Sequence, residues 1–158
     1  MERFNSSMET GGCVFCSLVK GELTPEVVAH RDRDTAVFPC LHQHPQNQGH
    51  MLVVPVVHVP YIYGIDRNLG GALMATVAAV AKAVKKIWVA DGITIRQNNE
   101  PSGGQDVFHV HFHVIPRFAN DGFNSGDDRW PFGAVEVPYE ERIRQAKMVR
   151  NGLAVECA

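Results

Sequence analysis

Three histidines stand at alternate positions in the segment His109-Val110-His111-Phe112-His113. If this segment is a β-strand, the three imidazoles share one face and the apolar residues between them share the other. A lone histidine is usually a surface residue or a satisfied core residue. Three on one face are harder to place in a core, because each buried imidazole needs a hydrogen-bond partner. The segment therefore predicts a chemical site.

Geometry limits what the three rings can do together. Neighbours on one strand face lie roughly 6.6 Å apart, and the outer pair lies roughly 13 Å apart. Two neighbours could share a metal ion with bonds of about 2.1 Å, but three in a row could not easily do so. The rings therefore have at least two roles. One suits a nucleophile for phosphorus, with the other ring nitrogen donating a hydrogen bond. Another suits a phosphate donor or a leaving-group acid.

The residues before the histidine segment favour phosphate chemistry. Asn98, Gly103, Gly104 and Gln105 lead directly into it. Glycines let backbone amides approach an anion closely, and the Asn and Gln side chains can donate further hydrogen bonds to a charged oxygen. Alone, this stretch would be an ordinary turn, and its place just before the histidines gives it weight.

The pair Cys13-x-x-Cys16 allows three interpretations. A redox pair normally begins a helix after a β-strand, and no strand-like sequence precedes Cys13. Two buried thiols without a metal are the plainest interpretation. The third is half of a zinc site, which needs two further ligands from elsewhere in the chain. We favour the zinc site.

The elements that must position these residues are short strands and two main helices. Strands are predicted over residues 27–30, 35–38, 51–55, 93–97 and 107–115, the last ended by Pro116. A short helical turn over 13–21 carries both cysteines, and residues 41–49 are predicted to be a loop. A long helix runs from a cap at Asp66 or Asn68 to about Val89, and a charged helix covers 139–151. We expect one α+β domain over 13–158, with about five antiparallel strands, after a disordered tail over 1–12.

Composition narrows the class of protein. The chain has 158 residues, enough for one domain with a real core. Its 45% hydrophobic and 20% charged residues are typical of a soluble globular protein. The net charge of −2 and the lack of a long basic run argue against a nucleic-acid polymer as partner. No apolar stretch is long enough to span a membrane, and residues 1–12 lack the apolar core of a signal peptide, so we expect a cytoplasmic protein.

Taken together, these segments resemble the histidine triad (HIT) family, in particular its zinc-containing bacterial branch. The family pattern H-φ-H-φ-H-φ-φ after Gly-Gln matches residues 104–115. Residues 49–58 are similar to the second family motif, G-H-x-L-V-x-P-x-x-H, and the Cys13–Cys16 pair followed by Lys20-Gly21-Glu22 resembles the opening of the bacterial branch. The match extends from about Cys13 to Arg117, and the combination of motifs is highly specific.

The resemblance implies a HIT-like fold and a role for each matching residue. The middle histidine of the family is the nucleophile, so His111 is expected to form a covalent nucleotidyl-histidine. His113 is expected to contact the phosphate and to take part in catalysis with Gln105. The family's other phosphate-holding residues correspond to Asn98 and Gly104, with His50 nearby.

The resemblance also implies a structural zinc ion and a dimer. The zinc ligands of the family correspond to Cys13, Cys16, His58 and His109, which removes His109 from catalysis. A closed site with four protein ligands has no open position for a substrate. Family members form homodimers partly through the long helix, and residues 69–84 are more apolar than one core face requires.

The chain departs from the family pattern at the ribose and at the leaving group. An acidic residue usually holds the ribose hydroxyls, and an ungapped alignment from Gly49 places His42 there. The position before the valine that leads into the triad is often Ser or Thr, and here it is Asp106. Phe15 and Phe38 are either the two walls of a base pocket or plain core residues.

Three functions follow from these observations. The first is a hydrolase or transferase that cleaves a nucleotide phosphoester or phosphoramidate at the α-phosphate. The second is a catalytic zinc hydrolase, in which His109, His111 and a third ligand hold a metal-bound water. The third is a nucleotide-binding regulator without turnover, which the absent ribose acid favours. Phosphoramidates, dinucleoside polyphosphates and nucleotidyl sulfates all suit the same chemistry, so the sequence does not name the substrate.

Overall fold

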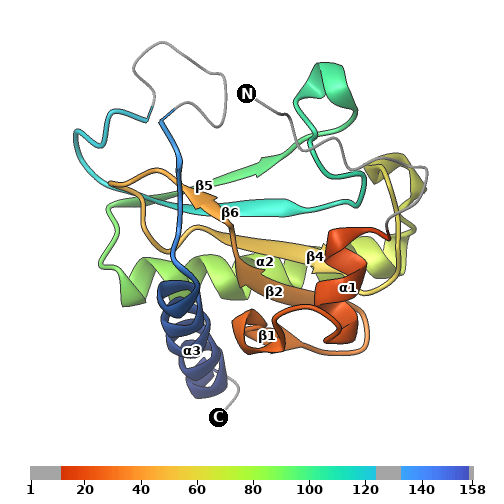
Figure 1. The fold of residues 1–158 in the computed structure, drawn as a ribbon, viewed down its shortest axis with the longest axis horizontal. Helices are drawn as coiled ribbons and strands as arrows, with labels where there is room; N and C mark the ends of the chain where they lie inside the picture. Colours follow the sequence, from red (N-terminus) through yellow and green to blue (C-terminus); the bar gives the residue numbers. More distant parts are fainter. Residues whose placement is uncertain (1–11, 124–132, 157–158) are drawn as a thin grey trace.

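A five-stranded antiparallel sheet carries the site in the computed structural model, which describes residues 12–123 and 133–156 (Figure 1). The strand order is β1-β2-β4-β6-β5, and every neighbouring pair is antiparallel. The strands are β1 (His30–Arg31), β2 (Thr35–Pro39), β4 (Met51–Pro55), β5 (Gly92–Gln97) and β6 (Phe112–Arg117). Two further strands, β3 (His42–Gln43) and β7 (Val135–Glu136), form a separate two-stranded sheet.

The two predicted main helices are confirmed, and a short third one carries the cysteines. They are α2 (Arg67–Ile87), α3 (Tyr139–Glu156) and α1 (Val14–Lys20), with 3-10 turns η1 (Pro25–Val27), η2 (Ile62–Gly64) and η3 (Pro101–Gly103). Asp66 caps α2, because its carboxylate accepts a hydrogen bond from the Leu69 backbone N–H at 2.8 Å. The structure therefore has the predicted α+β class with five antiparallel strands.

Each face of the large sheet is covered by different helices, and this creates two cores (Figure 1). On one face, Leu73, Val77, Val80 and Val84 of α2 pack with residues of α3 and with Met51, Val53, Phe112 and Val114 of the sheet. On the other face, Phe15, Leu18 and Val19 of α1 pack against Ala36, Phe38, Leu52 and Val54. Successive side chains along β2 and β4 therefore point alternately into one core and the other. The first core makes the sheet rigid, and the second fixes α1 beside the histidines.

The histidine strand differs from the prediction. Regular pairing begins at Phe112, so residues 107–111 precede β6 and do not belong to it. The backbone bends there, because the His109 N–H donates to the Val107 carbonyl at 2.8 Å and the Val110 N–H donates to the Val59 carbonyl at 2.7 Å. Pro116 does not end the strand. It lies opposite Ile93, where β4 no longer pairs with β6, and a residue without an N–H is tolerated where a strand has one neighbour.

Several other strand and helix boundaries also differ from those predicted. Of the strand predicted over 27–30, only Val27 belongs to the turn η1, residues 28–29 have no regular structure, and β1 begins only at His30. The predicted loop 41–49 contains β3, which pairs with β7. Helix α3 continues five residues beyond its predicted end at 151, to Glu156. Residues 1–11 of the predicted tail lie outside the described residues. No helix in the described part of the chain has the length and apolar character needed to cross a membrane.

Candidate functional site

His111 lies just before β6 and is almost fully buried. Its Nδ1 atom is 2.8 Å from the backbone carbonyl oxygen of His109. A carbonyl oxygen only accepts hydrogen bonds, so Nδ1 carries the proton and the lone pair of the neutral ring is on Nε2. The second ring nitrogen thus donates a hydrogen bond, as is required of a histidine nucleophile for phosphorus. Burial lowers the pKa of His111, against the opposing effects of that hydrogen bond and of the Asp106 carboxylate.

His113 lies on β6, beside the buried His50, which comes just before β4. Its Nδ1 atom is 2.9 Å from Nε2 of His50, and its ring centroid is 4.9 Å from that of His111. Burial lowers the pKa of His50 to about 3 and lowers that of His113 well below 6.5; His111 adds to the effect on both rings. Two imidazoles that share one hydrogen bond are therefore neutral at pH 7.

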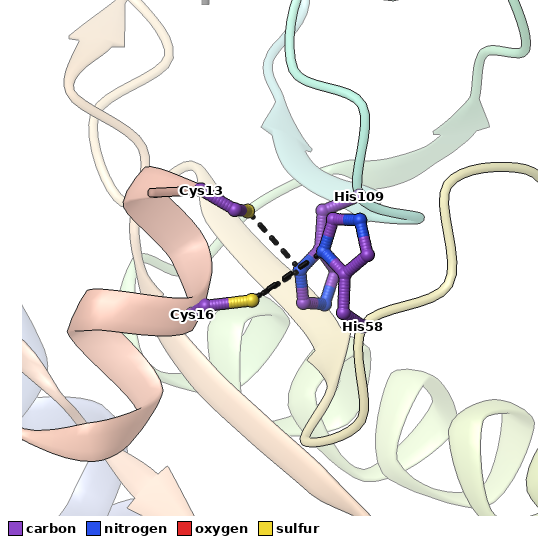
Figure 2. Close-up of side chains that lie close together, drawn as sticks. All are labelled: Cys13, Cys16, His58 and His109. Carbon is purple, nitrogen blue, oxygen red and sulfur yellow. Dashed lines mark hydrogen bonds between the residues drawn. The ribbon is translucent and has the colours of Figure 1, made fainter. Parts of the chain in front are cut away.

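Four donors from three separate segments converge beside α1 (Figure 2). Cys13 and Cys16 come from the start of α1, His58 from the loop after β4, and His109 from the bend before β6. The Nδ1 atom of His109 is 3.4 Å from the sulfur of Cys13 and 3.6 Å from that of Cys16, and Nδ1 of His58 is 3.4 Å from Cys16. Two sequence-distant histidines thus meet the Cys pair.

These distances fit a tetrahedral metal ion. With bonds of about 2.3 Å to sulfur and about 2.1 Å to nitrogen, the sulfur–nitrogen edge of a tetrahedron is about 3.6 Å. Both sulfurs approach the single lone pair of His109 Nδ1, and a thiol hydrogen bond could satisfy only one of them. The His109 Nε2 atom is 2.9 Å from the Pro55 carbonyl, so it carries the proton and leaves Nδ1 as the ligand atom. The donor set is therefore suited to zinc.

A second group of possible metal ligands lies in the histidine centre: Cys40, His50 and His113. This group has three possible ligands, whereas the group beside α1 has four. Two of the three, His50 and His113, are already hydrogen-bonded to each other. The first group is thus the better zinc site.

The loop before the triad is held together by Gln105. Its side chain donates to the carbonyls of Pro60 and Val107 at 2.8 and 2.9 Å and accepts from the Glu100 N–H at 2.8 Å. The amide that was expected to contact phosphate is therefore used within the loop. Gly104 has a φ of 83°, and a Cβ there would lie 2.9 Å from the Asn98 amide nitrogen, so this position requires glycine.

The remaining predicted residues have different positions. Phe15 and Phe38 are 7% and 2% exposed, with ring centroids 5.3 Å apart. A base cannot lie between two rings in direct contact, so the base-pocket interpretation is corrected to that of core residues. His42 is half-buried on β3, opposite Glu136 of β7. Asp106 is exposed at the start of the triad segment.

Buried amides beneath the site were not predicted. Gln43 accepts from the Gly49 N–H at 2.9 Å and donates to the carbonyl of Cys40 at 3.1 Å and to Gln145 of α3 at 2.8 Å. It therefore fixes the loop that delivers His50. Gly49 itself has no alternative, because a Cβ there would lie 2.4 Å from the Trp88 ring. The polar composition of residues 41–49 indicated an exposed loop and hid this role.

Comparison with known proteins gives a consistent result. A family model described as HIT domain matches residues 20–120. An uncharacterized HIT-like protein of Methanocaldococcus jannaschii is 36% identical over 136 residues, which cover 85% of this chain and 98% of that protein. The adenosine 5′-monophosphoramidase of Schizosaccharomyces pombe is 30% identical over 126 residues, covering 79% and 90%. A solved structure of a zinc-bound histidine triad family protein from Mycobacterium smegmatis is 26% identical, has a TM-score of 0.73, and aligns over 92% of this chain and 96% of that one.

Proposed function

Because the chain belongs to the HIT domain family, we propose that it is a nucleotidyl hydrolase or transferase that acts at an α-phosphate through a nucleotidyl-His111 intermediate. The observation that carries this proposal is the 2.8 Å contact between His111 Nδ1 and the His109 carbonyl. It fixes the tautomer in which Nε2 has a lone pair. The lowered pKa of His111 keeps that lone pair available at neutral pH.

In the first step, His111 Nε2 attacks the α-phosphorus in line with the leaving group. The Nε2–P bond forms and the bond from phosphorus to the leaving group breaks. If the proton between His50 and His113 belongs to His50 Nε2, His113 accepts at Nδ1 and keeps a proton on its Nε2. That proton is then available for a hydrogen bond to a phosphate oxygen, which stabilises the charge of the transition state.

In the second step, water attacks phosphorus and the P–N bond breaks. Until then the His111 ring carries a positive charge, because it is bonded to phosphorus at Nε2 and to hydrogen at Nδ1. The carboxylate of Asp106 raises the pKa of His111, which means that it favours the positive ring. Asp106 therefore stabilises the intermediate. Two in-line displacements give net retention of configuration at phosphorus.

The zinc ion is assigned a structural role, with Cys13, Cys16, His58 and His109 as ligands. When bound, it cross-links α1 to the segments after β4 and before β6 and supplies no chemistry to the reaction. Four protein ligands leave no position for a catalytic water. His111 uses its Nδ1 atom on a carbonyl and is not among these ligands, which argues against the catalytic zinc hydrolase.

The nucleoside is assigned to the β3 side of the site. His42 stands at the family's ribose-binding position, and the register of the β3–β7 pair sets Glu136 directly opposite it. Opposite residues in an antiparallel pair have Cβ atoms about 5 Å apart on one face. The absent carboxylate is therefore supplied across the strand pair by Glu136, and His42 is its neighbour.

A homodimer is also part of the proposal. Met74 of α2 and Ile95 of β5 are 52% and 42% exposed. Beyond β5, none of the described strands extends the sheet. A second copy would cover these apolar groups, and the molar mass in solution measures this directly.

The proposed function is tested by trapping the intermediate. Wild-type protein that is acid-quenched during turnover of adenosine 5′-phosphoramidate should carry an adenylyl group on His111, detected by peptide mass spectrometry. His111→Ala should lose the adduct and lower kcat by orders of magnitude, with nucleotide binding roughly kept. His30→Ala, which changes a histidine on β1, is the matched control. Nucleotide binding without adduct or turnover in the wild type would instead identify a regulator, and inversion at a chiral phosphorothioate would exclude the two-step mechanism.

A further inference from the structure

Arg96 stands beside the catalytic histidines without a role in the reaction described above. It lies on β5 directly opposite His113 of β6. Directly opposed residues of an antiparallel pair project from the same face of the sheet, so Arg96 shares the face of His113. The same register places Leu52 opposite His113 and Phe38 opposite Leu52. A single row therefore crosses the sheet in the order Phe38, Leu52, His113, Arg96.

This row has a closed side and an open side. Phe38 and Leu52 are 2% and 4% exposed, because α1 covers them. Arg96 is only partly buried. Among the described residues, no hydrogen bond or ion pair engages its guanidinium. A half-buried arginine without a carboxylate partner is a ready site for an anion, since its fork of N–H donors matches phosphate oxygens.

The strand on which Arg96 lies differs from the one assigned to the nucleoside. His42 and Glu136 belong to the separate β3–β7 pair, whereas Arg96 lies on β5 of the large sheet, directly beside His113. Asn98, two residues after Arg96, lies on the same face of the chain and reaches the loop at Gly104. With the nucleoside at the β3–β7 pair, Arg96 is left for the other substituent of an α-phosphate held at His111 and His113.

The charge of Arg96 agrees with this assignment. Arg96 lies directly opposite His113 and is one of the groups that lower the pKa of that histidine. An anion beyond the α-phosphate would meet this positive charge.

We propose that Arg96 forms an anion subsite for the leaving group, so that the preferred substrates carry a further phosphate or similar oxyanion on the α-phosphate. The proposal rests on the proposed function for the meaning of "leaving group", but the subsite itself is a binding property. It narrows the substrate class toward nucleotides with an anionic leaving group and away from those with a neutral amine.

The first test measures binding and needs no turnover. In the His111→Ala background, calorimetry should show that ADP binds more tightly than AMP, and Arg96→Gln should reduce this preference roughly tenfold to a hundredfold, as expected for a charge-assisted contact. Arg96→Lys should keep part of it. Arg33→Gln, with a side chain that is 95% exposed, is the matched control and should change nothing. An ADP preference that is absent, or unaffected by Arg96→Gln, would overturn the subsite.

The second test uses the active chain. The ratio of kcat/KM for diadenosine triphosphate to that for adenosine 5′-phosphoramidate should fall by a similar factor in Arg96→Gln, and less at high salt, where the charge is screened. A ratio that stays constant while both substrates turn over would contradict the proposal and leave the proposed function intact. If no His111 adduct forms but the ADP preference is preserved, the proposed function is contradicted and the anion subsite stands.

Discussion

Two backbone carbonyls set the tautomers on which the site depends. The Pro55 carbonyl accepts from His109 Nε2, and the His109 carbonyl accepts from His111 Nδ1. His109 thus offers its side chain to the proposed zinc site and its carbonyl to His111, the proposed nucleophile. His109→Ala removes the first contribution and keeps the second, so it should mainly lower stability. The bend at 109 is the physical link between the two sites.

The residue types of the site were predictable, and their contacts were not. Few functions require alternating histidines together with the Cys pair and the motif around His50, so these motifs indicated the kind of site. The roles of Gln105 and Gln43 depend on partners from distant segments, which are the Pro60 carbonyl for Gln105 and the Gln145 side chain for Gln43. A single sequence gives no signal for such partners. For the same reason Phe15 and Phe38 could not be divided between core and pocket.

His50 should make the free energy of unfolding depend on acid pH. Its pKa is about 3 in the folded chain against 6.5 ordinarily, because burial disfavours the charged ring. The unfolded chain therefore binds a proton that the folded chain does not. Stability is complete above about pH 6.5 and falls as the pH drops toward 3, by at most about 1.4 kcal/mol per pH unit for this group.

Chemical denaturation at a series of pH values measures this effect. His50→Gln should flatten the slope below pH 6.5 relative to wild type, whereas His30→Gln, which changes an exposed ring, should keep it. Acid release of zinc affects all three proteins alike, so the difference between variants isolates His50. Equal slopes in the wild type and His50→Gln would mean that His50 is not held neutral.

At the scale of elements, the strand over 51–55 and the long helix were predicted well, whereas the start of the histidine strand and the two-residue strands were predicted poorly. Residues 51–55 and the capped helix after Asp66 were predicted within two residues at either end, because each has a local signal. The pair β3–β7 has two residues per strand and exists through contacts such as the 2.8 Å bond from the Val137 N–H to the Leu41 carbonyl. Its two strands are about ninety residues apart in sequence, so no window of sequence contains the signal.

The β3–β7 pair should decide the preference for ribose. Glu136→Gln should lower the preference for AMP over 2′-deoxy-AMP roughly tenfold, because a carboxylate accepts stronger hydrogen bonds from a diol than an amide does. Adding His42→Asp to that variant moves the carboxylate across the pair and should restore the preference. His42→Asp alone places two carboxylates opposite each other, which is unfavourable. Affinities measured by calorimetry check all three variants.

If Glu136→Gln leaves the preference for ribose unchanged while His42→Asp strengthens it, the hydroxyls are bound by residue 42 alone. If neither change has an effect, the ribose lies elsewhere. Glu140→Gln, on the neighbouring first turn of α3, is the matched charge control.

At the scale of the whole molecule, the sheet is covered on one face by α2 and α3 and on the other by the short α1. An α-helix of seven residues is too short to be stable alone. Phe15, Leu18 and Val19 hold it through the second core, and the four-ligand group holds its first turn. Phe15 in turn packs edge-on against His111, with ring centroids 5.2 Å apart. The position of α1 therefore affects His111 directly.

Zinc should consequently stabilise the molecule without being required for its fold. The protein as purified should contain about one zinc per chain, measured by atomic emission. Cys13→Ser should lose the metal and melt about 6–12 °C lower, if the lost cross-link is worth about 3 kcal/mol in a chain of this size. The sheet and the α2 core should persist, because the fully buried Leu73, Val80 and Val84 belong to a core that includes none of the four ligands.

Cys40→Ser separates this role from the general effect of losing a thiol. Cys40 belongs to the three-donor group and not to the zinc site, so its variant should keep one zinc per chain and melt within a few degrees of wild type. If the wild type melts at the same temperature after chelation, zinc does not contribute to the stability of the fold. A chain whose metal survives Cys13→Ser but not Cys40→Ser would move it to the histidine centre. The expected order, with Cys13→Ser far more damaging than Cys40→Ser, follows from two sulfurs that lie 3.4 and 3.6 Å from one imidazole nitrogen, a geometry that suits a shared cation.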